Sequence, residues 1–303
     1  MLVFSKAMHK HKHLLPILAL IAANSLWGLS APLIKVGLQS IPVPIFIATR
    51  FFLAAMLLAP LARKVWRPLN GSQLLVLALA ATLDITLSVP AVNLGLTKTT
   101  ASNAGTIWLL MPILLFLLSV AFLKEKLQLK TFIGIMLALA GSLVIIGKPW
   151  SSGGMTSLTG NLLVLLAVFL NALAIIIIKP LTKHFHHWQI TFLYYLIGVI
   201  PLMIYASTQL GSWQVSKTTA HSWAAFVACI LISVLSNPLF YYALRSKTVQ
   251  NASVYQYLDP LVAVVGAWFL LAERPVPLFY LGVIFIVAGV YIVEMRPKPK
   301  LST

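Results

Sequence analysis

Long apolar stretches separated by short polar breaks dominate the chain between residues 14 and 295. An α-helix needs about 20 mostly apolar residues to cross the hydrocarbon core of a bilayer. Ten stretches meet this requirement, and proline, glycine and basic residues gather in the breaks between them. They cover residues 14–37, 44–62, 72–95, 100–123, 128–147, 158–180, 188–206, 221–244, 249–272 and 276–295. The pattern predicts an all-α integral membrane protein with ten transmembrane helices.

The composition and charge of the chain agree with this prediction. Of the 303 residues, 60% are hydrophobic and 9% are charged, whereas a soluble domain carries about 25% charged residues. With the N-terminus inside, the cytoplasmic segments hold sixteen of the 22 Lys and Arg residues and the outer segments hold five. This bias predicts a multi-pass protein of a bacterial-type inner (plasma) membrane with cytoplasmic tails at 1–13 and 296–303. It also explains the net charge of +17 without a nucleic-acid partner.

The sequence contains an internal repeat with a constant offset of 148 positions. The repeated residues are Asn103-Ala104, Pro112, Leu123, Glu125, Gly134 and Gly141, which recur as Asn251-Ala252, Pro260, Leu271, Glu273, Gly282 and Gly289. Each copy holds five predicted helices, an odd number, so the second copy enters the membrane upside down. We therefore expect two inverted five-helix repeats, residues 14–147 and 158–295, with a substrate site near the midplane between them.

Several of these residues match a known repeat. The sequence Leu26-Trp27-Gly28, Lys35, Arg50-Phe51 and the series Pro112, Glu125, Gly134 and Gly141 resemble the EamA-type repeat of the drug/metabolite transporter superfamily. The second half is similar from Pro260 onward but has Asn171-Ala172 where the first has Trp27-Gly28. The resemblance implies a ten-helix carrier, usually an exporter of a small metabolite, that works by alternating access. The family covers amino acids, amines, sugars and nucleotides, so the resemblance does not name the substrate; we expect a small metabolite such as an amino acid or an organic amine.

Two carboxylic acids, Asp84 and Asp259, lie inside predicted spans. An Asp at the centre of a span costs about 2.5–3.5 kcal/mol on insertion scales, so such a residue is a candidate for binding a substrate or a proton. Neither acid has a copy in the other repeat. The alternative is a structural role: Asp84 in a hydrogen bond, and Asp259 in capping a kink at the following proline or in pairing with a basic residue.

Other polar and aromatic residues are candidates to line the same site. On a continuous helix, Asn251, Tyr255 and Asp259 would form one polar stripe at intervals of four residues. Deeply placed aromatic rings offer π faces to an organic ligand or cation, although they also serve packing. The full set of predicted substrate-binding residues is Trp27, Asp84, Ser88, Asn103, Trp108, Asn171, Asn237, Tyr255, Gln256 and Asp259.

The remaining notable residues have structural interpretations. Glu125 and Glu273 are expected to fix their hairpins or cap the helices that follow. Arg50 and Lys35 are expected to extend toward the outer surface. The repeated glycines are expected to permit close packing of two helices, between the halves or in a dimer.

We expect a secondary carrier that contacts the lipid bilayer and a small-molecule substrate, with possible proton coupling, as a monomer or homodimer. No cofactor, metal or catalytic residue is predicted, because the sequence lacks zinc spacing, a phosphate-binding glycine loop and a nucleophile–base pair. The alternatives are a membrane-embedded enzyme acting on a lipid-like substrate and a passive channel. The enzyme would need paired acid–base or metal ligands, and the two acids are too isolated in the sequence to supply them.

Overall fold

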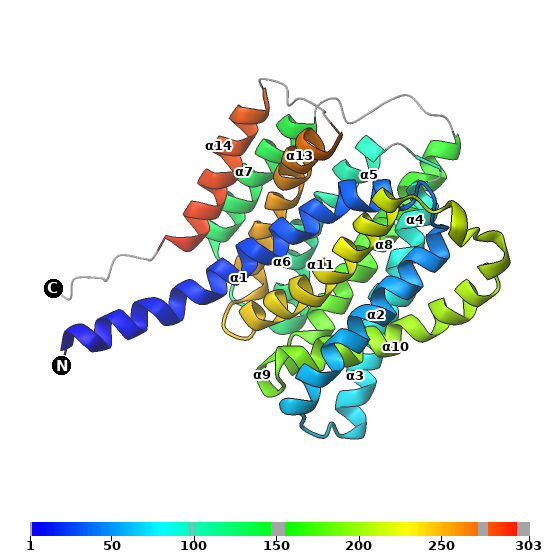
Figure 1. Ribbon diagram of the computed structural model, residues 1–303. Helices are drawn as coiled ribbons and strands as arrows, with labels where there is room; N and C mark the ends of the chain where they lie inside the picture. The colour runs from blue at the N-terminus through cyan, green and yellow to red at the C-terminus, as the bar shows by residue number, and fades with distance from the viewer. Residues whose placement is uncertain (1, 97, 100, 147–154, 272–277, 296–303) are drawn as a thin grey trace.

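The computed structural model describes residues 2–96, 98, 99, 101–146, 155–271 and 278–295, and every regular element in these ranges is helical (Figure 1). The first half contains α1 (Leu2–Gly37), α2 (Val43–Lys64), α3 (Gly71–Ala81), η1 (Thr82–Ser88), α4 (Val89–Leu96), α5 (Ala101–Trp108), α6 (Met111–Leu123) and α7 (Leu129–Ile146). The second half contains α8 (Met155–Ile178), α9 (Leu181–His184), α10 (His187–Ser207), η2 (Leu210–Ser212), η3 (Val215–Lys217), α11 (Ala220–Leu244), α12 (Val249–Ser253), η4 (Val254–Tyr257), α13 (Leu258–Leu271) and α14 (Leu278–Glu294).

Six of the described helical segments are long and apolar enough to cross a membrane. They are Leu14–Gly37, Val43–Lys64, Gly71–Gly95, Leu158–His184, His187–Ser207 and Ala220–Leu244. Shorter apolar helices cover Met111–Leu123, Leu129–Val144 and Phe279–Glu294. The predicted spans 100–123 and 249–272 are interrupted, the first between α5 and α6 and the second by the 3-10 segment η4. The fold is that of an all-helical, multi-pass membrane protein.

Polar residues at the helix starts explain several boundaries. The Asn70 carboxamide oxygen accepts a bond from the Gln73 backbone N–H (2.9 Å), and the Gln73 side chain accepts one from the Asn70 N–H (3.0 Å). This reciprocal capping box begins α3. The hydroxyl groups of Thr219 and Thr248 cap α11 and α12 in the simpler one-sided way.

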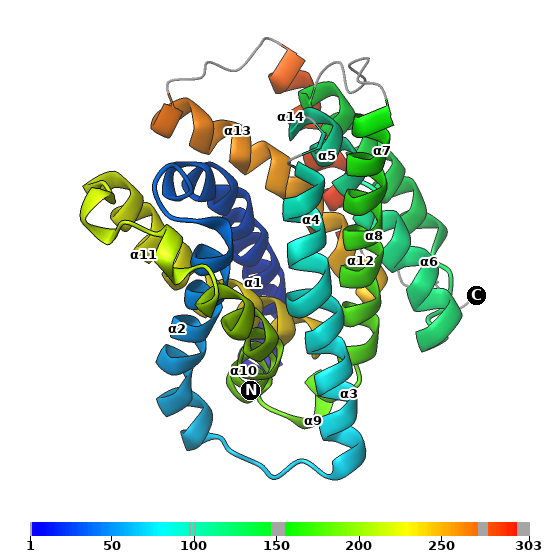
Figure 2. The same ribbon diagram turned by 90° about the vertical axis from the view of Figure 1, so that its right-hand side faces the viewer.

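Helices of the two halves pack against each other in reciprocal pairs (Figures 1 and 2). The first helix of each half lies on the third helical segment of the other: α1 packs on α11, and α8 packs on α3, η1 and α4. The second helices, α2 and α10, pack together. A further reciprocal pair follows the same rule: α1 packs on α13, and α8 packs on α6. The halves are therefore interleaved, and their contact surface runs through the middle of the molecule.

The last long helices of the halves, α7 and α14, cross at their glycines. A Cβ atom added to Gly134 would lie 2.6 Å from the Gly289 carbonyl oxygen, and one added to Gly141 would lie 2.6 Å from that of Gly282. Residue numbers rise along α7 as they fall along α14, so the two helices run antiparallel. The predicted close packing at these glycines is confirmed, and it joins the two halves of one chain.

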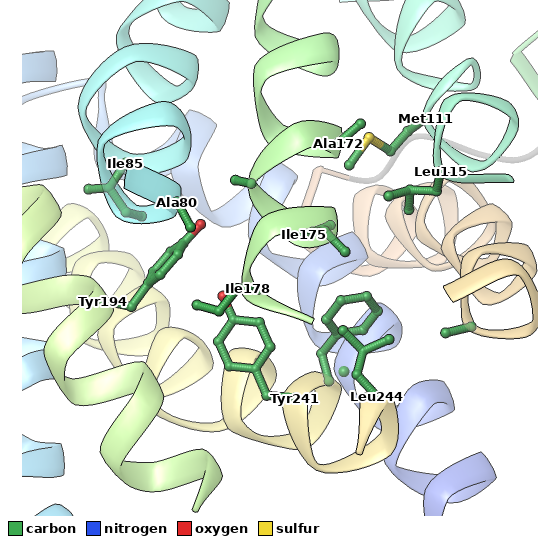
Figure 3. Close-up of a cluster of buried hydrophobic side chains, with 14 of the residues drawn as sticks. Ala80, Ile85, Met111, Leu115, Ala172, Ile175, Ile178, Tyr194, Tyr241 and Leu244 are labelled. Atoms are coloured by element: carbon green, nitrogen blue, oxygen red, sulfur yellow. The ribbon is translucent and has the colours of Figure 1, made fainter. Parts of the chain in front are cut away.

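The hydrophobic core also lies between the halves. In Figure 3, Ala80 and Ile85 of the first half face Ile178, Tyr194 and Tyr241 of the second. Both tyrosines are almost completely buried, with 1% and 4% of their surface exposed. A large phenol ring supplies much apolar contact, but its hydroxyl needs a polar partner. The Tyr194 ring therefore packs in the apolar core while its hydroxyl bonds to a polar residue, Asp84.

Candidate functional site

The third span contains a seven-residue π-helical segment, η1, which separates α3 from α4. The Val89 N–H bonds to the Asp84 carbonyl, five residues back instead of four. Pro90 follows directly, and a proline inside a helix clashes with the carbonyl four residues earlier, which favours a locally wider helix. Segments of this kind are frequently found at functional sites. Asp84 lies within this segment, near the middle of the span.

The carboxyl group of Asp84 is held by two residues of the other half of the chain. The Asn171 carboxamide nitrogen, on α8, donates to Oδ1 at 2.5 Å. The Tyr194 hydroxyl, on α10, donates to Oδ2 at 2.8 Å. Each carboxylate oxygen can accept two hydrogen bonds, so each retains capacity for a further donor. Asp84 is itself only half-buried, which leaves it accessible to such a donor.

A close approach of α10 to η1 positions Tyr194. A Cβ atom on Gly198 would lie 2.6 Å from the Ile85 Cβ, so only glycine permits this contact. The Thr86 hydroxyl donates to the Gly198 carbonyl at 2.8 Å. Figure 3 shows the Tyr194 side chain reaching from α10 to the helix that carries Ile85. The hydroxyl of Ser88, a predicted site residue, bonds to the Ala167 carbonyl at 2.8 Å and fixes η1 against α8.

A second polar cluster surrounds Arg50 on α2. Its Nε donates to the Ser233 hydroxyl on α11 at 2.7 Å, and the guanidinium carbon lies 5.2 Å from the centre of the Phe51 ring. The Tyr195 hydroxyl donates to the Ser233 carbonyl at 2.9 Å. The Phe51 and Tyr195 rings lie 5.1 Å apart. The expectation that Arg50 extends toward the outer surface is wrong, because this side chain is directed at a buried serine inside the helix bundle.

Asp259 lies at the contact between α13 and α1. A Cβ atom on Gly28 would lie 2.6 Å from the Asp259 carbonyl oxygen, so the two helices touch at this glycine. The carboxyl Oδ1 of Asp259 is buried without a hydrogen-bond partner among the described residues, and so is the carboxamide oxygen of Gln256. Buried polar atoms normally have a partner. These two predicted residues therefore remain available to a ligand or a proton.

Tyr255 does not share a helical stripe with Asp259. The 3-10 geometry of η4 interrupts the helix between α12 and α13, so the predicted spacing of four residues no longer places both side chains on one face. The Tyr255 hydroxyl donates to Glu294 at 2.8 Å, and Lys247 contacts both oxygens of the same carboxylate at 2.7 Å. The predicted stripe is corrected: the Tyr255 hydroxyl contacts the ion pair of Lys247 with Glu294, and its place in a substrate site stays a prediction.

The other predicted residues lie in several places. Trp27 is half-buried on α1, with its ring 5.1 Å from that of Phe240. Trp108 is half-buried at the end of α5 and packs on the core. Asn237 is half-buried on α11. The side chain of Asn103 lies outside the described residues.

Glu125 caps a helix of the opposite half. Its two carboxylate oxygens accept from the backbone N–H groups of Val249 (2.9 Å) and Gln250 (3.2 Å) at the start of α12. The Gln250 side chain returns a bond to the Lys126 carbonyl at 3.2 Å. The expected capping role is present, but the helix that it serves belongs to the second repeat. Glu273 lies outside the described residues.

A separate pocket of about 360 Å³ lies where α2 and α11 end and α10 begins. Its lining includes five basic side chains, namely Lys64, Arg67, His184, His186 and Arg245. Burial and then the charge of Arg245 lower the pKa of His186, so this imidazole is neutral at pH 7. The pocket lies at one end of the bundle and does not include the acids of the spans.

Among the ten predicted residues, the structure brings Asp84 and Asn171 into direct contact. It adds Tyr194 and the Arg50 cluster, whose roles the sequence analysis missed. A signal for Arg50 was present: a lone arginine inside a span is costly and calls for a function. Tyr194 gave no comparable signal, because its role depends on which residue of the other half lies opposite.

Comparisons with known proteins give a consistent result. The chain matches the uncharacterized transporter YetK of Bacillus subtilis at 25% identity, over 92% of this chain and 87% of the relative. It matches a probable terminal-alkyne amino-acid exporter of Streptantibioticus cattleyicolor at 24% identity, over 92% and 93%. An uncharacterized transporter of Archaeoglobus fulgidus is 27% identical over 95% and 99%.

The fold and the repeat are also found elsewhere. A solved crystal structure superposes with a TM-score of 0.76 at 16% identity, covering 92% of this chain and 97% of its own. The model of the EamA-like transporter family matches twice, over residues 14–147 and 158–295. This chain is therefore a member of the EamA-like transporter family.

Proposed function

We propose that the protein is a secondary active transporter that exports a small metabolite, such as an amino acid or an organic amine, by alternating access. The site centres on Asp84, which receives the cationic group of the substrate or a coupling proton. The observation that carries this proposal is the half-buried Asp84 carboxyl group, held in a π-helical turn by Asn171 and Tyr194 of the other half.

The contacts of this carboxyl group explain how binding could be linked to movement. Asp84 belongs to the first half, whereas both of its hydrogen-bond donors belong to the second. A cation that binds here shares the carboxylate oxygens with these two donors, so occupancy changes the contact between the halves. Alternating access needs such a dependence of inter-half contacts on the ligand. The orphaned carboxyl oxygen of Asp259 supplies a second place for a proton.

The same proposal includes two inverted five-helix repeats, residues 14–147 and 158–295, with both termini in the cytoplasm of a plasma membrane. The antiparallel crossing of α7 and α14 supports it, because the glycine pairs exchange under the repeat: Gly134 faces Gly289, and Gly141 faces Gly282. Reciprocal contact of this type accompanies a two-fold axis. The excess of Lys and Arg on one side supports the orientation.

Purified protein reconstituted into liposomes provides the test. Vesicles loaded with unlabelled amino acids or amines should take up the labelled compound against its gradient and in a saturable manner. Counterflow of this kind distinguishes a carrier from a channel, and recovery of the compound unchanged distinguishes it from an enzyme.

The Asp84→Asn variant tests the site itself. Asn keeps the shape, and its one carboxamide oxygen can still accept from one of the two donors, so the variant should fold and melt within a few degrees of the parent while counterflow is lost. Tyr205→Phe is the control for expression and purification of a variant. Tyr205 is exposed on α10, so this variant should transport at the parental rate. Parental rates and an unchanged pH profile in Asp84→Asn would contradict the assignment.

A further inference from the structure

Arg50 has an unused anion-binding capacity inside a span. It lies seven residues into the Val43–Lys64 span, and its hydrogen bond to Ser233 uses only the Nε–H group. The two terminal nitrogens of the guanidinium have neither a hydrogen-bond acceptor nor a carboxylate partner within the described part of the chain. Arg50 is half-buried as a residue, and its terminal nitrogens are not among the polar atoms of the described residues that are both fully buried and without a partner, so they keep some exposed surface.

The energetic cost of this arrangement calls for a compensating interaction. An arginine within a span is costly to insert into a bilayer, and an arginine near a helix end usually lowers this cost by extending to the interface. Arg50 is instead directed toward Ser233, which is 1% exposed on α11. A neutral hydroxyl and a neighbouring aromatic ring compensate the charge only in part. A small anion bound to the two terminal nitrogens would supply the rest of the compensation.

The position of Arg50 relative to Asp84 narrows the class of anion. Two consecutive residues of α10 connect the clusters. The Tyr194 hydroxyl bonds to Asp84. The Tyr195 hydroxyl bonds to the carbonyl of Ser233, whose own hydroxyl accepts the hydrogen bond from Arg50. Opposite charges therefore lie on the two sides of one tyrosine pair, without pairing with each other. A ligand with one positive and one negative group matches this arrangement.

We propose that Arg50 binds the carboxylate of the transported substrate, so that the substrates are zwitterions and amines without a carboxylate are excluded. The planar guanidinium offers two parallel N–H groups that match a carboxylate in bidentate geometry, which a lysine cannot reproduce. This inference rests on the proposed function, in which Asp84 receives the ammonium group.

Pairs of compounds that differ only in the carboxylate test the inference on the unaltered protein. Suitable pairs are phenylalanine with phenethylamine, leucine with isoamylamine, and lysine with cadaverine. We expect counterflow in proteoliposomes and a rise in melting temperature with at least one amino acid, and at least a tenfold weaker response to the matching amine. Equal responses to both members of every active pair would overturn the assignment of Arg50.

Variants separate recognition of the ligand from a structural role. Arg50→Gln should lose at least tenfold in affinity for the active amino acid, and Arg50→Lys should lose affinity as well because the forked geometry is gone. Ser233→Ala removes the hydrogen bond from Arg50 and the bond that the hydroxyl donates to the Cys229 carbonyl, but it keeps the guanidinium and should keep the preference for the amino acid over the amine. If Ser233→Ala abolishes the preference as fully as Arg50→Gln, Arg50 acts by holding α11 and the proposal is wrong.

A failure of the proposed function and a failure of the Arg50 assignment give different results. If the unaltered protein gives no counterflow with any pair, the proposed function fails, and the assignment of Arg50 falls with it. If amines are carried as well as amino acids and Asp84→Asn abolishes both, the proposed function stands and only the carboxylate assignment is overturned. The comparison of ligands uses the parent protein alone, so it gives a result even where Arg50→Gln does not fold.

Discussion

The glycine crossing between α7 and α14 permits a quantitative prediction about stability. A methyl group on Gly289 would lie 2.5 Å from the Gly134 carbonyl oxygen and 3.0 Å from the Ala138 Cβ, whereas ordinary contact begins at 3.4 Å. The helices would have to separate by about 0.9 Å to admit it. The atoms opposite belong to a helix backbone, so they cannot rotate away as a flexible side chain would.

The free energy of unfolding should fall in Gly289→Ala. Overpacking costs about 1–3 kcal/mol, and the lower entropy of the unfolded chain in a Gly→Ala change returns about 0.4–1 kcal/mol. The net loss is therefore up to about 2.5 kcal/mol. In the Gly134→Ala, Gly289→Ala double variant, the loss should be smaller than the sum of the two single losses, because one separation of the helices relieves both contacts.

Thermal melting of the purified protein in detergent checks this prediction. Gly71→Ala is the matched control, because a Cβ atom there meets nothing within 4 Å. The control should melt at or slightly above the temperature of the parent, and Gly289→Ala should melt below both. If Gly289→Ala melts as high as Gly71→Ala, the two helices do not pack at this distance and the reasoning fails.

Three further predictions concern topology, capping and the site. In a background without Cys229, Lys217→Cys should react with an impermeant thiol reagent outside intact cells while Lys124→Cys stays protected; equal labelling would contradict the inverted arrangement. Glu125→Ala should lower the free energy of unfolding by about 0.5–2 kcal/mol through loss of the α12 cap, measured by melting, and Glu125→Gln should lower it less; parental stability in both would refute the capping role. Tyr194→Phe should reduce counterflow and alter its pH profile by removing one donor from Asp84, with Tyr205→Phe as the control; an unchanged profile would show that this hydroxyl does not tune the acid.

Much of the helical framework could be predicted from the sequence, because apolar length and helix-breaking residues act locally. The predicted segment 14–37 ends at the same residue as α1, and 221–244 coincides with α11 except for its first residue. The glycine crossing was predictable for a related reason: small residues at matching positions in the two copies of a repeat limit which helix faces can approach closely. These signals do not require knowledge of the tertiary partner.

The composition of the site was predictable only in part. Asp84 stood out because an acid inside a span is expensive, but its donor Tyr194 is one of many tyrosines and is selected by the packing of α10. The polar stripe through Tyr255 failed because a regular helix was assumed, whereas η4 changes the number of residues per turn. Glu125 was correctly interpreted as a cap, yet its target was missed because capping across the two halves depends on tertiary structure.

The π-helical segment has a consequence for the resting state of the proposed carrier. Its copy in the second half, residues 230–236, lies in the α-helical α11, although the repeat aligns the two without a gap. In a perfectly symmetric carrier, exchanging the conformations of the two halves would convert one open state into the other. A two-fold rotation would relate these two states, and they would have equal energy. Here the exchange would require α11 to adopt the shape of η1, but Ile232 and Val234 occupy the positions of Asp84 and Thr86. We therefore expect the empty carrier to rest with an unequal population of its two open states, a bias set by the backbone before any substrate or ion gradient acts.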